Sequence, residues 1–569
     1  MAFVNSECAE FDFIIIGSGA ASVAASLVMK QSGRSALIIE KQEKFGGSTG
    51  YSGGILWVPN NPLMQREGVP DSFEAAQEYL NSTLFYTGPG SSHPRREAFL
   101  RGAPRAIDFL EQKGMKFNRV EGYADYYDER PGGHQRGRTL TAKLFDLSEL
   151  GEWQSRLSVN RGVSVPAGLD ELNDLFSLKT TWAGKKAALK VGARLIYQKL
   201  LGRDIRGAGA ALQGRLLQIA LRENLQIWMA SEVEGFIVEN DCVTGVTILR
   251  GTQRIKVKAS LGVLINAGGF AHNAEMRAKY DQPASNMWTS ANPGDTGEVM
   301  TAAMALGAAS DCLDESWWLA TSIGPDGSFP EGAYDAFGKP VPFLHHFDIS
   351  YPHVIMVDQD GNRFVNEASS YMEIGQRMFA QHKEKGNCVP AWAIIESRHR
   401  NRYFWATVLG KTPQSWLDSG YMKKADTIKE LAELCGINPQ GLQESVERFN
   451  GFAKAGVDQD FGKGARAFDR YHGDPSVRPN PNLGEIIKPP FYAVAIVPGD
   501  LGTCGGLVTD EHGRVLRTEG GIIPGLYATG NSTASVMGRS YPGAGATIAP
   551  SLTFGFLAAE HAVRTNDKS

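Results

Sequence analysis

The sequence predicts an α/β fold in which a Rossmann-like dinucleotide-binding domain is interrupted by an inserted α+β domain. Two apolar runs near the start, residues 11–16 and 35–40, indicate parallel strands. The first run leads into Gly17-Ser18-Gly19 and the second ends in an acid about 20 residues later, which is the spacing of a dinucleotide fingerprint. Between about residues 291 and 482 tryptophans, prolines and loops replace this rhythm, which predicts a separate domain.

The first glycine turn lies where a pyrophosphate would be received. A helix is expected over residues 23–31, so the turn would present helix N-terminal N–H groups to an anion. Glu40 would then accept hydrogen bonds from the adenosine ribose hydroxyls. The third glycine position of the fingerprint holds Ser22, a small residue that can replace glycine there. The cofactor contacts expected here are Gly17, Ser18, Gly19, Ala20, Ala21, Glu40 and Lys41.

Later segments extend the same domain. Residues 225–230 and Val233 predict a strand near the adenine, residues 236–249 a hairpin, and residues 262–269 a buried strand that ends in glycines. Residues 525–531 predict another strand and glycine turn, of the kind that holds the far half of FAD in flavoproteins with two dinucleotide folds. FAD is therefore the expected cofactor. The further expected contacts are Gly46, Gly47, Ser48, Thr49, Ser52, Gly53, Gly54, Val233, Ala267, Gly268, Gly269, Gly530, Asn531, Ser551 and Leu552.

The chain is too long for one hydrophobic core, since single cores stop growing at about 250–300 residues. We expect the FAD-binding domain to comprise residues 1–290, with a helical insertion at about 150–215, and residues 483–569. The catalytic domain is expected over residues 291–482.

Composition indicates an ordinary water-soluble protein. The chain has 42% hydrophobic and 21% charged residues and a net charge of −4, which gives no reason to expect nucleic acid as a partner. The six cysteines are scattered without a Cys-x-x-Cys pair, as is typical of a reducing compartment, and they argue against a zinc site or a disulfide reductase. Neither a leader pattern nor a membrane-spanning apolar run is visible. The expected location is the cytoplasm.

One segment departs from this ordinary surface. Residues 177–206 carry eight basic side chains against the single acid Asp204, with apolar residues such as Trp182 and Leu189 interleaved. Two interpretations stay open: a solvated basic helix face, or a peripheral contact with an anionic membrane, at its inner face, where a lipophilic substrate would be dissolved.

Motifs along nearly the whole chain resemble those of the bacterial FAD-dependent 3-ketosteroid Δ1-dehydrogenases, within the fumarate-reductase-like flavoprotein group. The residues that carry the resemblance are Phe45-Gly46-Gly47-Ser48-Thr49, Tyr51 to Asn61, Tyr126-Tyr127, Arg363 to Glu367 followed by Tyr371, Val497 to Thr503, and Tyr541-Pro542-Gly543-Ala544-Gly545. The tyrosines are the specific part, because the glycine fingerprint is shared by the wider group. The resemblance implies a catalytic domain of the fumarate-reductase flavoprotein type.

The resemblance also implies a reaction and roles for four residues. A 3-ketosteroid would be enolised at C3, lose a proton from C2 and pass a hydride from C1 to flavin N5. In the family, the positions of Tyr541 and the Gly545 N–H donate hydrogen bonds to the C3 carbonyl, Tyr371 is the base, and Tyr126 assists it. A phenol with a pKa near 10 is a weak base, so Tyr371 would need such assistance. Tyr123 and Tyr127 could fill the role given to Tyr126.

Other functions are also compatible with parts of the sequence. A Δ4-(5α)-desaturase of the same group, a fumarate-reductase-like enzyme and a non-catalytic flavin-binding protein are the alternatives; the last is argued against by the large inserted domain. The tyrosines and the apolar residues Trp288, Trp317, Trp318 and Phe343 favour a fused-ring ketone over a dicarboxylate, for which only Arg539 lies near the final motif.

Neither a metal nor a covalent flavin is expected. His345, His346 and His353 match no metal-ligand spacing and are expected at the surface. No histidine lies close to residues 46–49, where relatives with covalent flavin carry the attachment, so non-covalent FAD is expected. Glu367 is expected to order the segment before Tyr371. A quinone or another acceptor would reoxidise the flavin.

Overall fold

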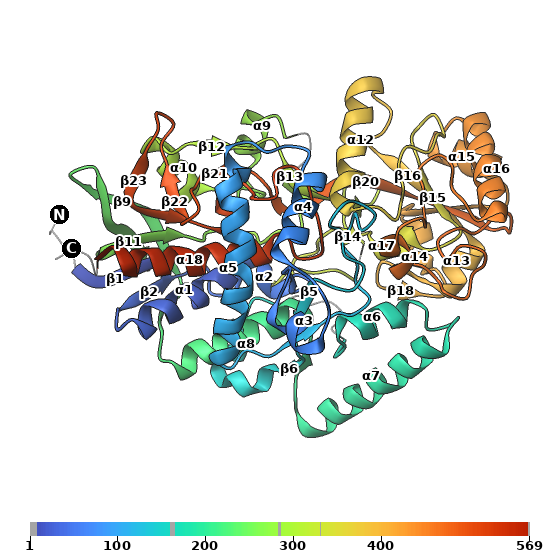
Figure 1. Ribbon diagram of the computed structural model, residues 1–569. Helices are drawn as coiled ribbons and strands as arrows, with labels where there is room; N and C mark the ends of the chain where they lie inside the picture. Colours follow the sequence, from blue (N-terminus) through green and yellow to red (C-terminus); the bar gives the residue numbers. More distant parts are fainter. Residues whose placement is uncertain (1–7, 160–164, 283–285, 331, 567–569) are drawn as a thin grey trace.

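The computed structural model describes residues 8–159, 165–282, 286–330 and 332–566, which form two lobes, each built on a large β-sheet (Figure 1). Residues 1–7, on which the expectation of no leader partly depends, lie outside the described residues. In the part of the chain that is described, no helix is both long and apolar enough to cross a bilayer.

The first sheet confirms the Rossmann-like prediction. Its strand order is β22-β23-β11-β1-β2-β8, and β11, β1, β2, β8 and β23 run parallel where they pair. The predicted hairpin extends β11 through β10 and β9. The strands are β1 (Cys8–Ile16), β2 (Ala36–Ile39), β8 (Gln226–Trp228), β9 (Ser231–Glu239), β10 (Cys242–Arg250), β11 (Gln253–Ile265), β22 (Arg514–Leu516) and β23 (Ile522–Ala528).

Helices from both ends of the chain cover this sheet. α1 (Ala20–Gln31) begins directly after the first glycine turn, three residues earlier than predicted, and packs against α18 (Ile548–Asn566) and α8 (Ala208–Arg222). The α1 residues between Ala20 and Met29 are all buried, so this helix is held on every side rather than on one face.

The second sheet is antiparallel, with the order β14-β13-β20-β16-β15 and β19 paired to β20. Strand β20 lies within residues 483–569, the expected second part of the FAD-binding domain, but its apolar residues pair with β13 and β16 and not with the first sheet. The strands are β13 (Ser316–Ser322), β14 (Phe343–Leu344), β15 (Val354–Val357), β16 (Ala391–Glu396), β19 (Met422–Ala425) and β20 (Phe491–Thr503).

Helices α12 (Tyr371–Lys385), α15 (Ile428–Cys435) and α16 (Pro439–Ala455) belong to this second lobe (Figure 1). The predicted helical insertion is present as η2 (Leu147–Arg156), α6 (Leu169–Phe176), α7 (Trp182–Leu201) and part of α8. α7 lies along the lower edge of the molecule in Figure 1.

The remaining elements are short, apart from α4 and α5. The helices are α2 (Gly47–Tyr51), α3 (Pro62–Glu67), α4 (Phe73–Thr83), η1 (Pro89–Ser91), α5 (His93–Gln112), α9 (Ala274–Lys279), η3 (Asn286–Trp288), α10 (Glu298–Ala305), α11 (Phe347–Ser350), α13 (Ser397–Arg402), α14 (Gln414–Asp418), α17 (Ala467–Tyr471) and η4 (Gly530–Ser532). The strands are β3 (Ile55–Trp57), β4 (Phe117–Arg119), β5 (Thr139–Ala142), β6 (Phe145–Asp146), β7 (Ile205–Arg206), β12 (Ser310–Asp311), β17 (Phe404–Trp405), β18 (Val408–Leu409) and β21 (Gly506–Leu507).

Candidate active site

A single cavity is lined by both lobes and holds most of the predicted site residues. The three tyrosines and Gly545 lie on its wall together with residues of the glycine turns. The predicted cofactor contacts on the wall are Gly17, Ser18, Gly19, Glu40, Lys41, Gly47, Ser48, Thr49, Ser52, Gly53, Gly54, Val233, Ala267, Gly268, Gly530, Asn531 and Ser551. Segments more than 500 residues apart thus meet around one space.

The first glycine turn fits a pyrophosphate. Gly17 has φ +97°, and a Cβ there would lie 2.2 Å from the carbonyl oxygen of Asn266, so only glycine is accommodated. The Ser22 hydroxyl donates to the Gly17 carbonyl (2.8 Å) and accepts from Nδ2 of Asn266 (2.7 Å). Serine therefore replaces the third fingerprint glycine by tying the turn to β1 and β11. The N-terminus of α1 is left open to the cavity.

Glu40 follows β2 directly and lines the same cavity. Its carboxylate accepts hydrogen bonds from the backbone N–H and hydroxyl of Ser18 (3.1 and 2.5 Å) and from the Gln42 N–H (2.9 Å). Burial raises the pKa of Glu40, and these hydrogen bonds oppose the shift. A carboxylate fixed at the end of the second strand is where a dinucleotide fold places its ribose acceptor.

Five predicted contacts are not on the cavity wall: Ala20, Ala21, Gly46, Gly269 and Leu552. Ala20, Ala21 and Leu552 point into the core between helices α1 and α18. Gly46 and Gly269 have structural roles. The Gly46 N–H donates to the Ser18 hydroxyl (2.7 Å). A Cβ on Gly269 would lie only 1.9 Å from Oγ1 of Thr503. A glycine pair in sequence does not reveal which member faces the ligand.

Sequence reasoning missed several wall residues, among them Asp295. Burial raises the pKa of Asp295 to about 8, while the charge of Lys41 and hydrogen bonding with Ser48 oppose the shift. Its carboxylate fills the space where a Cβ on Gly268 would lie (2.2 Å from Oδ1). In the sequence its segment, Asn292-Pro293-Gly294-Asp295, reads as an ordinary turn.

The three predicted catalytic tyrosines form one cluster at the end of the cavity. The ring centroids of Tyr371 and Tyr541 lie 4.6 Å apart, those of Tyr126 and Tyr541 5.5 Å, and those of Tyr126 and Tyr371 5.8 Å. Tyr371 begins α12, Tyr126 lies in the loop between β4 and β5, and Tyr541 lies before α18. The Tyr126 N–H donates to the carbonyl of Pro542 (3.0 Å), which fixes Tyr126 beside Tyr541.

Gly545 lies next to the Tyr541 hydroxyl. It has φ +93°, and a Cβ would lie 2.3 Å from the carbonyl oxygen of Ile55, so glycine is required. The pKa of Tyr541 is raised by burial, and hydrogen bonding with Thr547, with Tyr371 and with the Gly545 N–H opposes the shift. Hydrogen bonding of the Gly545 N–H with the Tyr541 oxygen places this N–H and the phenol of Tyr541 beside each other on the cavity wall.

The phenols are neutral in this environment. Burial raises the pKa of Tyr371 well above its ordinary value, and the nearby Tyr541 adds to the rise; hydrogen bonding with Tyr126 opposes it. Burial also raises the pKa of Tyr126 well above 10. Hydrogen bonding with Tyr126 lowers the pKa of Tyr371, as expected for a residue that assists the base, but burial raises that pKa by more.

Position relative to the cavity distinguishes Tyr123, Tyr126 and Tyr127 as candidates for the residue that assists Tyr371. Tyr123 and Tyr126 line the cavity and Tyr127 does not. The Tyr127 ring lies edge-on to Phe85 at 6.2 Å, on the other side of the loop, with Arg466 over it. Judged by the ring contacts of the structure, Tyr126 is the one of these three tyrosines whose ring lies nearest to those of Tyr371 and Tyr541.

Two of the three histidines expected at the surface, His345 and His353, are buried, so that expectation is wrong for them. His345 and His353 have 0% and 4% of their surface exposed, and His346 lines the cavity. His345 donates through Nδ1 to the carboxylate of Asp348 (2.7 Å), and its Nε2 is hydrogen-bonded to the Ser322 hydroxyl (2.6 Å), so it serves the packing of the second lobe. No group of three or more metal-ligating side chains occurs within residues 8–159, 165–282, 286–330 and 332–566.

The apolar residues proposed to surround a fused ring divide into two pairs. Trp317 and Phe343 line the cavity, whereas Trp288 and Trp318 do not. Trp318 packs edge-on against Phe379 (4.7 Å) beneath α12. Arg539 is also off the wall, because its guanidinium pairs with Asp314 (2.7 Å) and Glu315 (3.3 Å).

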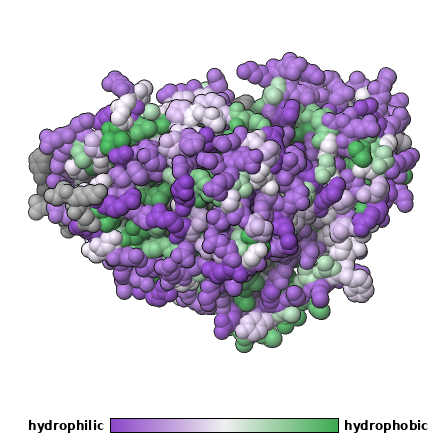
Figure 2. All heavy atoms as spheres, in the orientation of Figure 1, coloured by the Kyte–Doolittle hydropathy of each residue, from purple (hydrophilic) through white to green (hydrophobic). Residues whose placement is uncertain are grey.

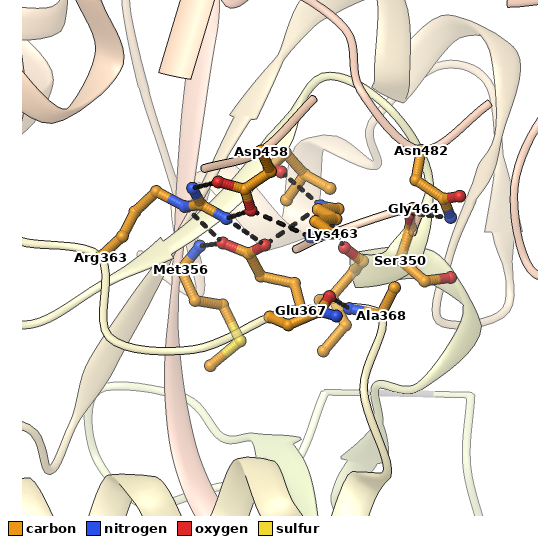
Figure 3. A network of polar contacts seen from close by, with 12 residues as sticks. Ser350, Met356, Arg363, Glu367, Ala368, Asp458, Lys463, Gly464 and Asn482 are labelled. Atoms are coloured by element: carbon orange, nitrogen blue, oxygen red, sulfur yellow. Dashed lines mark hydrogen bonds and ion pairs between the residues drawn. The ribbon is translucent and has the colours of Figure 1, made fainter. Parts of the chain in front are cut away.

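A buried ion network supports the segment before Tyr371, as Figure 3 shows. Glu367 accepts hydrogen bonds from Arg363 (3.0 Å) and the Met356 N–H (3.0 Å), and Lys463 lies 3.4 Å away. Asp458 pairs with the other side of Arg363 (3.0 Å). Burial alone would raise the pKa of Glu367, but the charges of Arg363 and Lys463 hold it below its ordinary value.

Replacing Glu367 by Gln is expected to lower the free energy of unfolding by about 1.5–3 kcal/mol, since it removes a charged hydrogen-bond acceptor from two buried cations. Because the folded-state pKa of Glu367 is depressed, the loss should be full at neutral pH and should shrink as the pH falls through that pKa. Denaturant unfolding at several pH values measures it. Glu97→Gln, in an exposed pair with Arg101, is the control and should change stability little; equal effects would contradict the prediction.

Comparisons with known proteins agree with this geometry. A family model described as an FAD binding domain matches residues 12–548. The chain is 40% identical to the 3-oxosteroid 1-dehydrogenase of Mycobacterium tuberculosis, over 97% of this chain and 98% of that one. The crystal structure of 3-ketosteroid Δ1-dehydrogenase from Sterolibacterium denitrificans, in complex with 1,4-androstadiene-3,17-dione, is 33% identical with a TM-score of 0.90, covering 98% and 100% of the two chains.

A flavocytochrome c3 fumarate reductase is 20% identical with a TM-score of 0.60, covering 98% of this chain and 78% of that one, which shows a shared fold. The predicted fold class is thereby confirmed, as is the family resemblance carried by the tyrosine motifs. The chain belongs to the FAD-binding flavoproteins and, among them, to the family of the 3-oxosteroid 1-dehydrogenases.

Proposed function

We propose that the protein is an FAD-dependent enzyme that introduces the C1–C2 double bond into 3-ketosteroids. The observation that carries the proposal is the convergence of Tyr126, Tyr371, Tyr541 and Gly545 on the wall of the cavity that also contains the dinucleotide-type glycine turn. The named activity of relatives at 40% identity over nearly the full chain supports it.

The residues have separate roles in this reaction. The Tyr541 hydroxyl and the Gly545 N–H donate hydrogen bonds to the C3 carbonyl oxygen, where negative charge develops as C2 loses its proton. Tyr371 takes that proton, and Tyr126 hydrogen-bonds to the Tyr371 oxygen as it does so. Bound FAD supplies the hydride acceptor at N5. Trp317 and Phe343 give the ring system an apolar wall and exclude water.

The glycine turn and Glu40 would hold the pyrophosphate and the adenosine ribose of FAD. The wall residues of α2, and those of the turn that follows β23, would hold the other half of FAD. We propose that the cofactor is non-covalent, so acid precipitation should release all of the flavin into the supernatant. A quinone or another acceptor would reoxidise it.

An anaerobic titration of the yellow holoenzyme tests the function. Androst-4-ene-3,17-dione should bleach the flavin and yield the 1,4-diene, and 5α-androstane-3,17-dione should yield the 1-ene. A 4-ene product from the second steroid would instead identify a Δ4-(5α)-desaturase, and reoxidation by fumarate a fumarate reductase. A flavin that no ketosteroid bleaches would leave a non-catalytic flavin-binding protein.

We also propose that the exposed face of α7 contacts an anionic membrane at its inner surface. The large apolar side chains on this helix are unusually exposed: Trp182 83%, Leu189 76%, Ile196 63% and Leu200 78%. Lys185, Lys186, Lys190 and Lys199 are exposed among them. Figure 2 shows apolar atoms along the lower edge, where Figure 1 places α7. Apolar side chains interleaved with lysines suit the interface of an anionic bilayer.

Reversing Lys185, Lys186 and Lys190 to Glu is expected to reduce binding to anionic phospholipid vesicles by roughly 100-fold or more, since each basic residue near such a surface contributes about 1 kcal/mol. Co-sedimentation at low salt measures it. Reversal of the exposed Lys383, Lys385 and Lys429, far from α7, is the matched control and should bind as wild type. Equal sedimentation of all three proteins would leave α7 as a solvated basic helix.

A further inference from the structure

The proton that Tyr371 takes from C2 needs a destination beyond Tyr371. Tyr371 is a neutral phenol, because burial raises its pKa, and it can accept a proton only if it loses its own at the same time. Its hydrogen-bonding neighbour Tyr126 is equally buried and also neutral. A route onward from Tyr126 is therefore required.

Such a route is present on the far side of Tyr126. The ring of Tyr123 is stacked on that of Tyr126, with centroids 6.5 Å apart, and hydrogen bonding with Tyr126 opposes the rise that burial gives the pKa of Tyr123. The Tyr123 hydroxyl lies 3.3 Å from Nε2 of His472. His472 has 1% of its surface exposed. The rings of Tyr371, Tyr126 and Tyr123 are thus successive neighbours, and the Tyr123 hydroxyl contacts the imidazole of His472.

His472 is suited to receive a proton. Burial, with a smaller contribution from His346, lowers the pKa of His472 well below its ordinary value, so the resting ring is neutral and its Nε2 can accept one. Its Nδ1 is buried without a hydrogen-bond partner among the described residues. The same is true of Nε2 of His346, whose ring lies 5.2 Å away and which reaches the cavity wall.

We propose that Tyr126, Tyr123 and His472 form a proton relay that drains Tyr371 during the reaction. As the C2–H bond breaks, its proton bonds to the Tyr371 oxygen; the Tyr371 proton moves to Tyr126, that of Tyr126 to Tyr123, and that of Tyr123 to Nε2 of His472. The electron pair of the C2–H bond becomes the C1–C2 double bond as the hydride leaves C1 for the acceptor of the proposed function, on which this inference rests. No free phenolate is needed.

The protons on the oxygen of Tyr123 and the ring nitrogens of His472, unlike those on carbon, can be replaced by deuterium, which makes the role of these two residues measurable. Stopped-flow reduction of the holoenzyme by androst-4-ene-3,17-dione in mixtures of H2O and D2O gives the number of protons in flight. Wild type should show a curved dependence on the deuterium fraction. Tyr123→Phe and His472→Gln should reduce the flavin about 100-fold more slowly, the low end of a general acid–base contribution, and give a straight line or no isotope effect.

Tyr127→Phe is the matched control, because this neighbouring phenol lies off the cavity wall. It should keep the wild-type rate and the curved dependence. Flavin content and product binding, followed by absorbance, verify that each variant is folded. Wild-type rates in both relay variants would overturn the relay, as would slower reduction with the curvature unchanged, which is the mark of a purely structural role. Failure of wild type to be reduced would instead overturn the proposed function.

Discussion

Replacing Tyr371 by Phe is expected to slow reduction of the flavin by ketosteroid by roughly 10²–10⁴-fold, the usual contribution of a positioned general base. The ring at the start of α12 would remain between Tyr126 and Tyr541, so packing is conserved and only the hydroxyl is lost. FAD content and steroid binding should therefore be unchanged. Stopped-flow absorbance under anaerobic conditions measures the rate, and flavin perturbation on adding the 1,4-diene product measures binding.

Tyr351→Phe provides the control for removal of a buried phenol. Tyr351 is as buried as Tyr371, belongs to the same lobe and contacts Ser177 (3.3 Å), but it does not line the cavity. It should retain wild-type reduction. If Tyr371→Phe turned over like wild type, the proposed base would have to be another group.

The pattern of apolar runs and glycines was sufficient to predict the first sheet. Parallel buried strands read as continuous apolar runs, and β2, residues 13–16 of β1 and residues 263–265 of β11 do so. The pairing of β20 could not be predicted, because this strand also begins as a continuous apolar run and its partners, β13 and β16, are far away in sequence. Strand pairing of that kind depends on the whole sheet.

The site was predicted through motifs, and its failures have a physical pattern. Tyr371, Tyr541 and Gly545 belong to sequence signatures, and the structure brings them to the wall of one cavity. The buried histidines were misplaced because an imidazole tolerates burial when it is packed among aromatic rings, and that packing comes from distant elements. His345, for example, is stacked on Trp405, with ring centroids 4.4 Å apart.

Asp295 illustrates a second reason. Nothing in its neighbourhood in the sequence marks it as more buried than any other acid of a glycine-containing turn. Its position follows from the absence of a side chain on Gly268, which lies in a separate segment after β11. Such complementarity between a glycine and a distant side chain is visible only after folding.

Replacing Tyr541 by Phe is expected to cost about 2.7–4 kcal/mol of transition-state stabilisation, the amount lost when one oxyanion-hole donor is removed, which corresponds to a 10²–10³-fold slower reduction. The Gly545 N–H would remain as the second donor, so measurable activity should persist. The defect should be specific to the ketone: binding of a 3-keto steroid should weaken, while a steroid without oxygen at C3 should bind equally to both proteins.

Tyr541→Phe and Tyr371→Phe should therefore differ in their effects on binding of the ketone. Loss of the base should leave binding of the ketone intact and remove its turnover, whereas loss of the donor should weaken both together, because the carbonyl oxygen is contacted in the ground state and more strongly as charge develops on it. Thr547→Val, which removes the hydroxyl 3.4 Å from that of Tyr541, is the control. It should alter the rate far less than Tyr541→Phe, since Thr547 only orients the donor; equal losses would move the donor role away from Tyr541.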